Sequence, residues 1–129
     1  MKITEQELNP KNIKLNDEQK KNFAILLEKI NAIRDKYGKP MLVTSGVRSW
    51  EDQVRIDNAA GRKPRTGSMH LMACAVDIWD RDRHLWGWVM DNLKFLEKLG
   101  VYMEDGTYTR TWVHFQIKPP VSGNRIFKP

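Results

Sequence analysis

Two residues near the middle of the chain could bind a metal ion together. His70 and Asp77 lie in the segment SMHLMACAVDIW, residues 68–79, and the whole chain has only three histidines. The histidine follows a Gly-Ser pair that is typical of a loop, and the aspartate stands in an apolar run. The same pattern also fits a turn that leads into a buried strand with Asp77 at its end. A metal site would need a further ligand, a base and a substrate-binding group from other parts of the chain.

A third candidate ligand, His114, stands in the segment TWVHFQI, whose alternation is typical of a strand. Alternation places Val113 and Phe115 on the core face and His114 on the face that looks outward, where it could meet the first two residues in a cleft. Two imidazole nitrogens and one carboxylate oxygen are a common ligand set of catalytic zinc. A Trp-Val-His strand by itself more often has only a structural role. The prediction of a metal site therefore depends on the combination of His70, Asp77 and His114.

The elements that must position these residues can be placed by periodicity and by turn signals. We expect helices at residues 17–37, 50–60 and 83–99, and strands at 41–46, 74–79, 101–104 and 111–117. The last two strands are close enough in sequence to form an antiparallel hairpin, and the tail 118–129 is expected to be irregular. The order predicts one α+β domain, residues 1–129, with a small, mostly antiparallel sheet packed against helices.

Capping signals support the first two helices. Asn16 is a favourable N-cap, and Gly38 stops the first helix. Ser49 is the predicted N-cap of the second helix, where Asp52 three residues later would complete a variant of the capping box, and Gly61 ends it.

Composition limits the class of protein. The chain has 129 residues, a formal charge of +6 and one cysteine, so no intrachain disulfide is possible. The charge favours an anionic partner, such as nucleic acid, a membrane surface or an acidic polymer like a bacterial cell wall, but no recognition motif for nucleic acid accompanies it. The sequence contains neither a membrane span nor a signal peptide. We therefore expect a protein made in the cytoplasm, or one that leaves it by a route that the sequence does not encode.

The pattern Ser68-x-His70-x-x-Ala73-x-Ala75-x-Asp77 resembles a known signature. It is similar to the Ser-x-His-x-x-Gly-x-Ala-x-Asp motif of the zinc D-alanyl-D-alanine carboxypeptidase and L-alanyl-D-glutamate endopeptidase family, which shares its fold with the hedgehog signalling domain. The segments TSGVRSWEDQ and WVHF resemble the flanking segments of that family in the same order.

The resemblance covers roughly residues 41–117 and implies a peptidase that binds one zinc ion per chain and hydrolyses peptidoglycan stem peptides. The implied zinc ligands are His70, Asp77 and His114. Arg48 would bind a carboxylate or carbonyl of the peptide and assist catalysis, since its guanidinium is a planar and permanently charged donor. Ser68 and Gln53 would also bind substrate.

The chain departs from the family pattern at two positions. Ala73 replaces the signature glycine, which costs little at a negative φ but is unfavourable at a positive one. Thr111 stands where many members have the acidic general base. The nearest acids are Glu104 and Asp105, and the predicted hairpin would bring them beside His114. Glu104 is the preferred base because it lies at the end of a strand.

The sequence also leaves alternative interpretations open. A thiol hydrolase could use Cys74 with a histidine, although a cysteine in an apolar run is more often a core residue. Without a base at Thr111, the domain could be a zinc-stabilised module that binds wall peptides or a protein partner. A metal-free basic binding domain is a third interpretation. We expect His84 at the surface or a helix start, a monomer, and release to the wall as in phage lysis enzymes.

Overall fold

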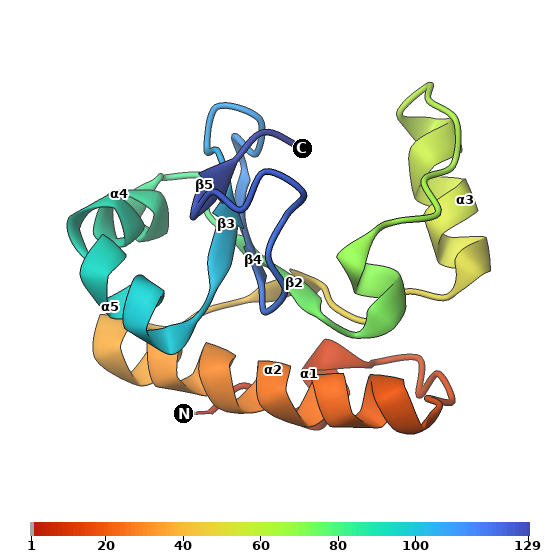
Figure 1. The fold of residues 1–129 in the computed structure, drawn as a ribbon, viewed down its shortest axis with the longest axis horizontal. Coiled ribbons are helices and arrows are strands. Elements are labelled where there is room, and N and C mark those ends of the chain that lie inside the picture. The colour runs from red at the N-terminus through yellow and green to blue at the C-terminus, as the bar shows by residue number, and fades with distance from the viewer. Residues whose placement is uncertain (1) are drawn as a thin grey trace.

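The computed structural model describes residues 2–129 as a small sheet with helices around it (Figure 1). The helical elements are α1 (Glu5–Leu8), α2 (Asp17–Tyr37), α3 (Trp50–Ala59), the 3₁₀ turn η1 (Met69–Met72), α4 (His84–Asp91) and α5 (Leu93–Leu99). The strands are β1 (Val43–Ser45), β2 (Ala75–Trp79), β3 (Tyr102–Glu104), β4 (Trp112–Gln116) and β5 (Ile126–Phe127). The predicted α+β class is confirmed. No helix in residues 2–129 is long and apolar enough to cross a membrane.

The sheet has the order β1-β2-β4-β3-β5, so the two longest strands lie at its centre. All pairs are antiparallel except β3 with β5, which are parallel. The predicted β3–β4 hairpin is therefore present. The tail was expected to be irregular, and that prediction is wrong for β5, which depends on a partner distant in sequence and was therefore invisible to local periodicity.

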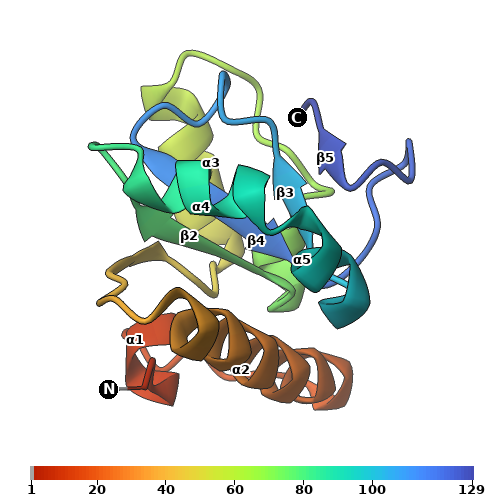
Figure 2. The same cartoon turned by 90° about the vertical axis from the view of Figure 1, so that its left-hand side faces the viewer.

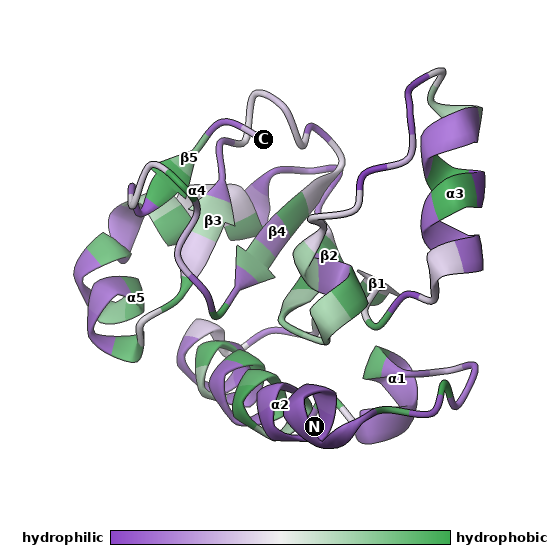
Figure 3. Ribbon diagram, turned by 45° about the vertical axis from the view of Figure 1, so that its right-hand side comes forward, coloured by the Kyte–Doolittle hydropathy of each residue, from purple (hydrophilic) through white to green (hydrophobic). Residues whose placement is uncertain are grey.

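Helix α2 covers the core face of the sheet (Figure 2). Its apolar residues recur at helical spacing, as the green bands along α2 in Figure 3 show, and Leu26, Ile30 and Ile33 are fully buried. On the sheet side, Val113 and Phe115 of β4 complete this core. Burying each such side chain contributes roughly 1.5–3 kcal/mol.

The first turns of α2 also anchor the segment that carries His70. Asn16 and Gln19 form the capping box, in which each side chain accepts from the other residue's backbone amide. The side-chain amide of Gln19 donates to the carbonyl of Leu71 at 2.8 Å, and that of Asn22 donates to the carbonyl of Met72 at 3.1 Å. The N-terminus of α2 therefore fixes η1 against the edge of the core.

Two helical predictions differ from the structure. The helix expected at 83–99 is two helices, α4 and α5, which meet at Asn92. Asn92 donates its side-chain amide to the carbonyl of Trp88, a local hydrogen bond that competes with helix continuation. Helix α1 was not expected, although Thr4 and Glu7 form a capping box that the segment TEQE encodes.

Candidate metal centre

The central strand pair places two of the predicted ligands opposite each other. Asp77 of β2 and His114 of β4 are direct cross-strand partners, and side chains at such positions lie close together on one face. That face was expected to look outward, but both side chains are buried. Part of the cover comes from β5, whose Phe127 ring lies edge-on to His114 with centroids 6.2 Å apart.

His70 reaches the same place from η1, on the other side of Asp77. Its Nδ1 lies 2.8 Å from the carbonyl oxygen of Gly46, and its Nε2 lies 3.3 Å from Oδ2 of Asp77. A carbonyl oxygen only accepts, so Nδ1 carries the proton and donates to it. The lone pair of Nε2 is left facing Asp77.

The imidazole of His114 is oriented by a hydrogen bond at Nε2, the nitrogen that faces away from Asp77. Its Nδ1 lies 2.8 Å from Oδ1 of Asp77, and its Nε2 lies 2.8 Å from Oε1 of Gln116. Gln116 donates its amide to the carbonyl of Lys118, so its oxygen must accept from Nε2 of His114. Nδ1 is therefore the nitrogen that is available to a metal ion. Gln116 had no predicted role, although it stands two residues after His114 in a predicted strand and hence on the same face.

Together, His70, Asp77 and His114 form a compact, buried group of potential metal ligands. One ligand atom from each lies within 4.8 Å of the others. Each histidine is held by an acceptor on the nitrogen that faces away from the group, which is the usual support of metal-bound imidazole. The donor set of two nitrogens and a carboxylate fits zinc.

The electrostatics of the group favour a cation. Burial alone would raise the pKa of Asp77, but His70 and His114 more than offset this effect, so its pKa lies far below the ordinary value. Burial is the largest cause of the lowered pKa of His70, although Asp77 acts in the opposite direction. Burial acts in the same direction on His114, but Asp77 outweighs it and raises the pKa. A cation bound here would replace the proton that Asp77 favours on His114.

Arg48 closes one side of the group. Its backbone amide donates to the carbonyl of His70 at 3.1 Å. Its guanidinium donates to Oγ of Ser45 at 2.9 Å, to Oε1 of Gln53 at 3.2 Å and to Oδ2 of Asp77 at 3.3 Å. The side chain is only 10% exposed. Arg48 is thus held at the ligand group rather than projecting freely over it.

The two candidate acids occupy different places. Oε1 of Glu104 lies 3.4 Å from Nδ1 of His114, and its side chain is 15% exposed. Asp105 instead accepts from the backbone and the hydroxyl of Thr107. The hairpin register, continued by one residue, places Glu104 and not Asp105 opposite His114. Thr111 is exposed.

The two other residues assigned to substrate lie differently. Gln53 is fully buried and contacts Arg48 and Asp57, so it lies behind Arg48 rather than at a surface that a substrate could touch. Ser68 is half-buried at the start of η1, and its hydroxyl does not cap that turn. It remains free to meet a ligand.

The remaining sequence predictions concern Ala73, Cys74 and His84. Ala73 has φ 59 and ψ 32, so the alanine adopts the left-handed conformation that favours the family's glycine. Cys74 is buried, its thiol contacts the carbonyl of Met72, and burial raises its pKa, all of which disfavour a nucleophile. His84 is exposed and begins α4, as predicted.

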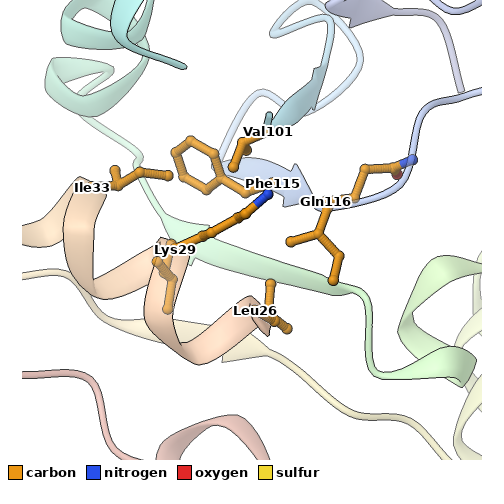
Figure 4. Close-up of a pocket in the computed structure, with 8 residues that line it drawn as sticks. Leu26, Lys29, Ile33, Val101, Phe115 and Gln116 are labelled. Carbon is orange, nitrogen blue, oxygen red and sulfur yellow. The ribbon is translucent and has the colours of Figure 1, made fainter. Parts of the chain in front are cut away.

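The apolar pocket in Figure 4 does not belong to this site. It lies between α2 and β4 on the core face, where Leu26, Lys29 and Phe115 line it, and it has no room for a water molecule. It is a narrow gap between packed side chains of the core.

Comparisons with known proteins agree with the observed fold. The solved structure of the L-Ala D-Glu endopeptidase ChiX from Serratia marcescens superposes with a TM-score of 0.54, at 20% sequence identity, over 85% of this chain and 93% of that one. No curated protein sequence showed a significant match. The family model of Peptidase M15 matches residues 2–116. That match spans the elements that hold His70, Asp77, His114 and Arg48, and the chain belongs to the Peptidase M15 family.

Proposed function

We propose that this peptidase is zinc-dependent and hydrolyses peptide bonds in the stem peptides of bacterial peptidoglycan. The observation that carries the proposal is the convergence of His70 Nε2, Asp77 and His114 Nδ1 on one buried point, with Glu104 and Arg48 beside it. The L-Ala D-Glu endopeptidase activity of ChiX supports the substrate class. The bond is of the L-Ala-D-Glu or the D-Ala-D-Ala type, as in an endopeptidase or a carboxypeptidase.

His70, Asp77 and His114 would hold one zinc ion per chain. When bound there, zinc lowers the pKa of water and polarises a carbonyl group. Glu104 accepts a proton from the attacking water at Oε1 as the new carbon–oxygen bond forms. It then delivers that proton to the leaving amine as the carbon–nitrogen bond breaks. The guanidinium of Arg48 binds a substrate carboxylate or stabilises the developing oxyanion.

The setting of this activity is also part of the proposal. A monomer with a net charge of +6 is suited to an anionic wall polymer, and action at the wall after release from the cytoplasm, as in phage lysis, would bring it to its substrate.

Metal analysis followed by product mapping tests the proposal. We expect one zinc per chain in the purified protein, and loss of zinc in His70→Ala, Asp77→Ala and His114→Ala. Mass spectrometry of digested peptidoglycan should show one new carboxyl terminus and one new amino terminus, which together identify the bond. Zinc and peptide binding without any cleavage would instead establish the zinc-stabilised binding module. A protein that binds no zinc would contradict both.

A further inference from the structure

A second buried carboxylate, Asp57 of α3, lies outside the metal centre and has no role in the proposal above. It is fully buried. Asp57 accepts from Nε2 of Gln53 at 2.8 Å, from Nε of Arg62 at 2.8 Å and from the backbone amide of Arg65 at 2.8 Å. A buried carboxylate with this many donors is held in one orientation.

Asp57 dictates the orientation of the Gln53 amide. An ionised carboxylate can only accept hydrogen bonds, so the NH₂ group of Gln53 must point toward Asp57. The carbonyl oxygen of the same amide then faces Arg48, whose Nη1 lies 3.2 Å away. If the Gln53 amide were flipped, its NH₂ group would face the Arg48 guanidinium, and two hydrogen-bond donors would lie against each other.

The same carboxylate also holds the loop that leads to the metal centre. Arg62 and Arg65 lie in the segment between α3 and η1, and both pair with Asp57, at 2.8 and 3.1 Å. That segment continues directly into Ser68 and His70. Asp57 thereby connects the loop before one ligand to the helix that follows Arg48 (Figure 1).

We infer that Asp57 is a positioning residue, which fixes the Gln53 amide so that this amide and Asp77 hold the Arg48 guanidinium in place. Gln53 acts through Arg48, since it is fully buried and donates to Asp57. The effect on turnover rests on the proposed peptidase function. The orientation of Arg48 does not depend on it.

The first experiment compares turnover among variants of one helix. In Gln53→Met and Asp57→Asn, kcat/KM should fall by up to about a hundredfold, because a shift of about 1 Å in a positioning group can cost that much. Asp52→Asn is the matched control. Asp52 is also a buried carboxylate of α3, with hydrogen bonds from Ser49, Lys11 and Arg55 and none from Arg48. It should lose thermal stability but keep the parent turnover. Equal losses of turnover in all three variants would overturn the inference.

A double-mutant cycle tests whether the effect passes through Arg48. If Gln53 acts only on the guanidinium, adding Gln53→Met to Arg48→Lys should cost no further turnover. Losses that multiply would assign Gln53 an independent role and overturn the inference.

Hydrogen exchange of the Arg48 Nε–H, followed by NMR in the zinc-free protein, gives a readout without activity. Exchange should be slow in the parent and in Asp52→Asn, and at least about tenfold faster in Gln53→Met and Asp57→Asn, since those variants loosen the guanidinium. If Asp57→Asn does not fold, the comparison of Gln53→Met with the parent tests the inference. A parent that cleaves nothing but shows this pattern would refute the proposed function and support the inference. Unchanged exchange in the variants would overturn the inference itself.

Discussion

Glu104 is the carboxylate nearest to the ligand group, with Oε1 3.4 Å from Nδ1 of His114. Glu104→Gln keeps the shape of the side chain but removes the proton acceptor. We expect turnover to fall by roughly a hundred- to ten-thousand-fold, while zinc content and the melting temperature stay near the parent values. Steady-state kinetics on a stem peptide, with metal analysis of the same samples, measure this.

Asp105→Asn is the matched control, because its carboxylate bonds to Thr107 within its own turn. It should retain most of the activity. The reverse ranking would move the general base to Asp105, and parent rates in both variants would exclude the two acids together.

Arg48→Lys keeps the charge but loses the planar fork of donors. The guanidinium makes hydrogen bonds to Ser45, Gln53 and Asp77 in a nearly buried place, and an ammonium cannot reproduce that geometry. We expect lower kcat/KM together with a lower melting temperature, measured by kinetics and calorimetry. Normal turnover in a destabilised variant would show that Arg48 serves only the fold.

The candidate ligands could be proposed from sequence because the chain has only three histidines and because His70 and Asp77 have a distinctive spacing. The groups that orient them were harder to recognise. Gly46 acts through a backbone carbonyl, which any residue has, and Asp57 is one acidic residue among many on a helix. Only the folded chain shows that Gln53 lies behind Arg48 instead of at the surface.

The contact between α1 and the segment after β1 gives a prediction at the scale of elements. A Cβ on Gly46 would lie 2.2 Å from the backbone oxygen of Leu8, which already accepts from the amide of Val47. Gly46→Ala must therefore push Leu8 and Gly46 apart, and we expect this to displace the Gly46 carbonyl that orients His70. We expect a loss of about 1–3 kcal/mol of stability and a roughly 10- to 100-fold weaker zinc affinity, measured by urea denaturation and by competition with a chelator.

Gly87→Ala is the control for this substitution. Gly87 lies inside α4, and a Cβ added there would meet no other atom within 4 Å. Alanine there should stabilise the protein by roughly 0.5–1 kcal/mol and leave zinc affinity unchanged. Unaltered zinc affinity in Gly46→Ala would show that the His70 ring does not depend on that carbonyl.

Elements with strong local signals were predicted well, and elements made by distant pairing were not. The boundaries of α2 follow from Asn16 and Gly38, which act through neighbours in sequence. In contrast, β5 is defined by β3, with the amide of Asp105 donating to the carbonyl of Phe127 at 2.8 Å. No periodicity in a two-residue strand can encode such a partner.

At the scale of the whole molecule, acid should weaken the fold through its buried carboxylates. Burial alone would raise the pKa of Asp57, but hydrogen bonds from Gln53, Arg65 and Arg62 lower it below its ordinary value. A lowered pKa contributes stability that is fully present above about pH 4 and is lost as the pH falls further. The difference in unfolding free energy between the parent and Asp57→Asn should therefore shrink as the pH falls below about 4. A constant difference in urea denaturation would contradict this.

The net charge of +6 predicts how salt affects activity on intact walls. Screening shortens from about 10 Å at 0.1 M ionic strength to about 3 Å at 1 M, so long-range attraction to an anionic polymer weakens. We expect turnover of intact wall to fall with salt while turnover of a short soluble stem peptide changes little. Equal responses of the two substrates would show that the charge does not guide binding.

The labelling rate of the buried Cys74 thiol can report local opening of the fold. Cys74 precedes β2, and its carbonyl accepts from the amide of Ile117 just after β4, so local separation of this strand pair should expose the buried sulfur to a thiol reagent. The same two strands carry Asp77 and His114. Zinc at about a hundred times its Kd should therefore slow labelling by about a hundredfold. The rate of thiol labelling, followed by absorbance with a chromogenic disulfide reagent, would then measure metal occupancy without any substrate.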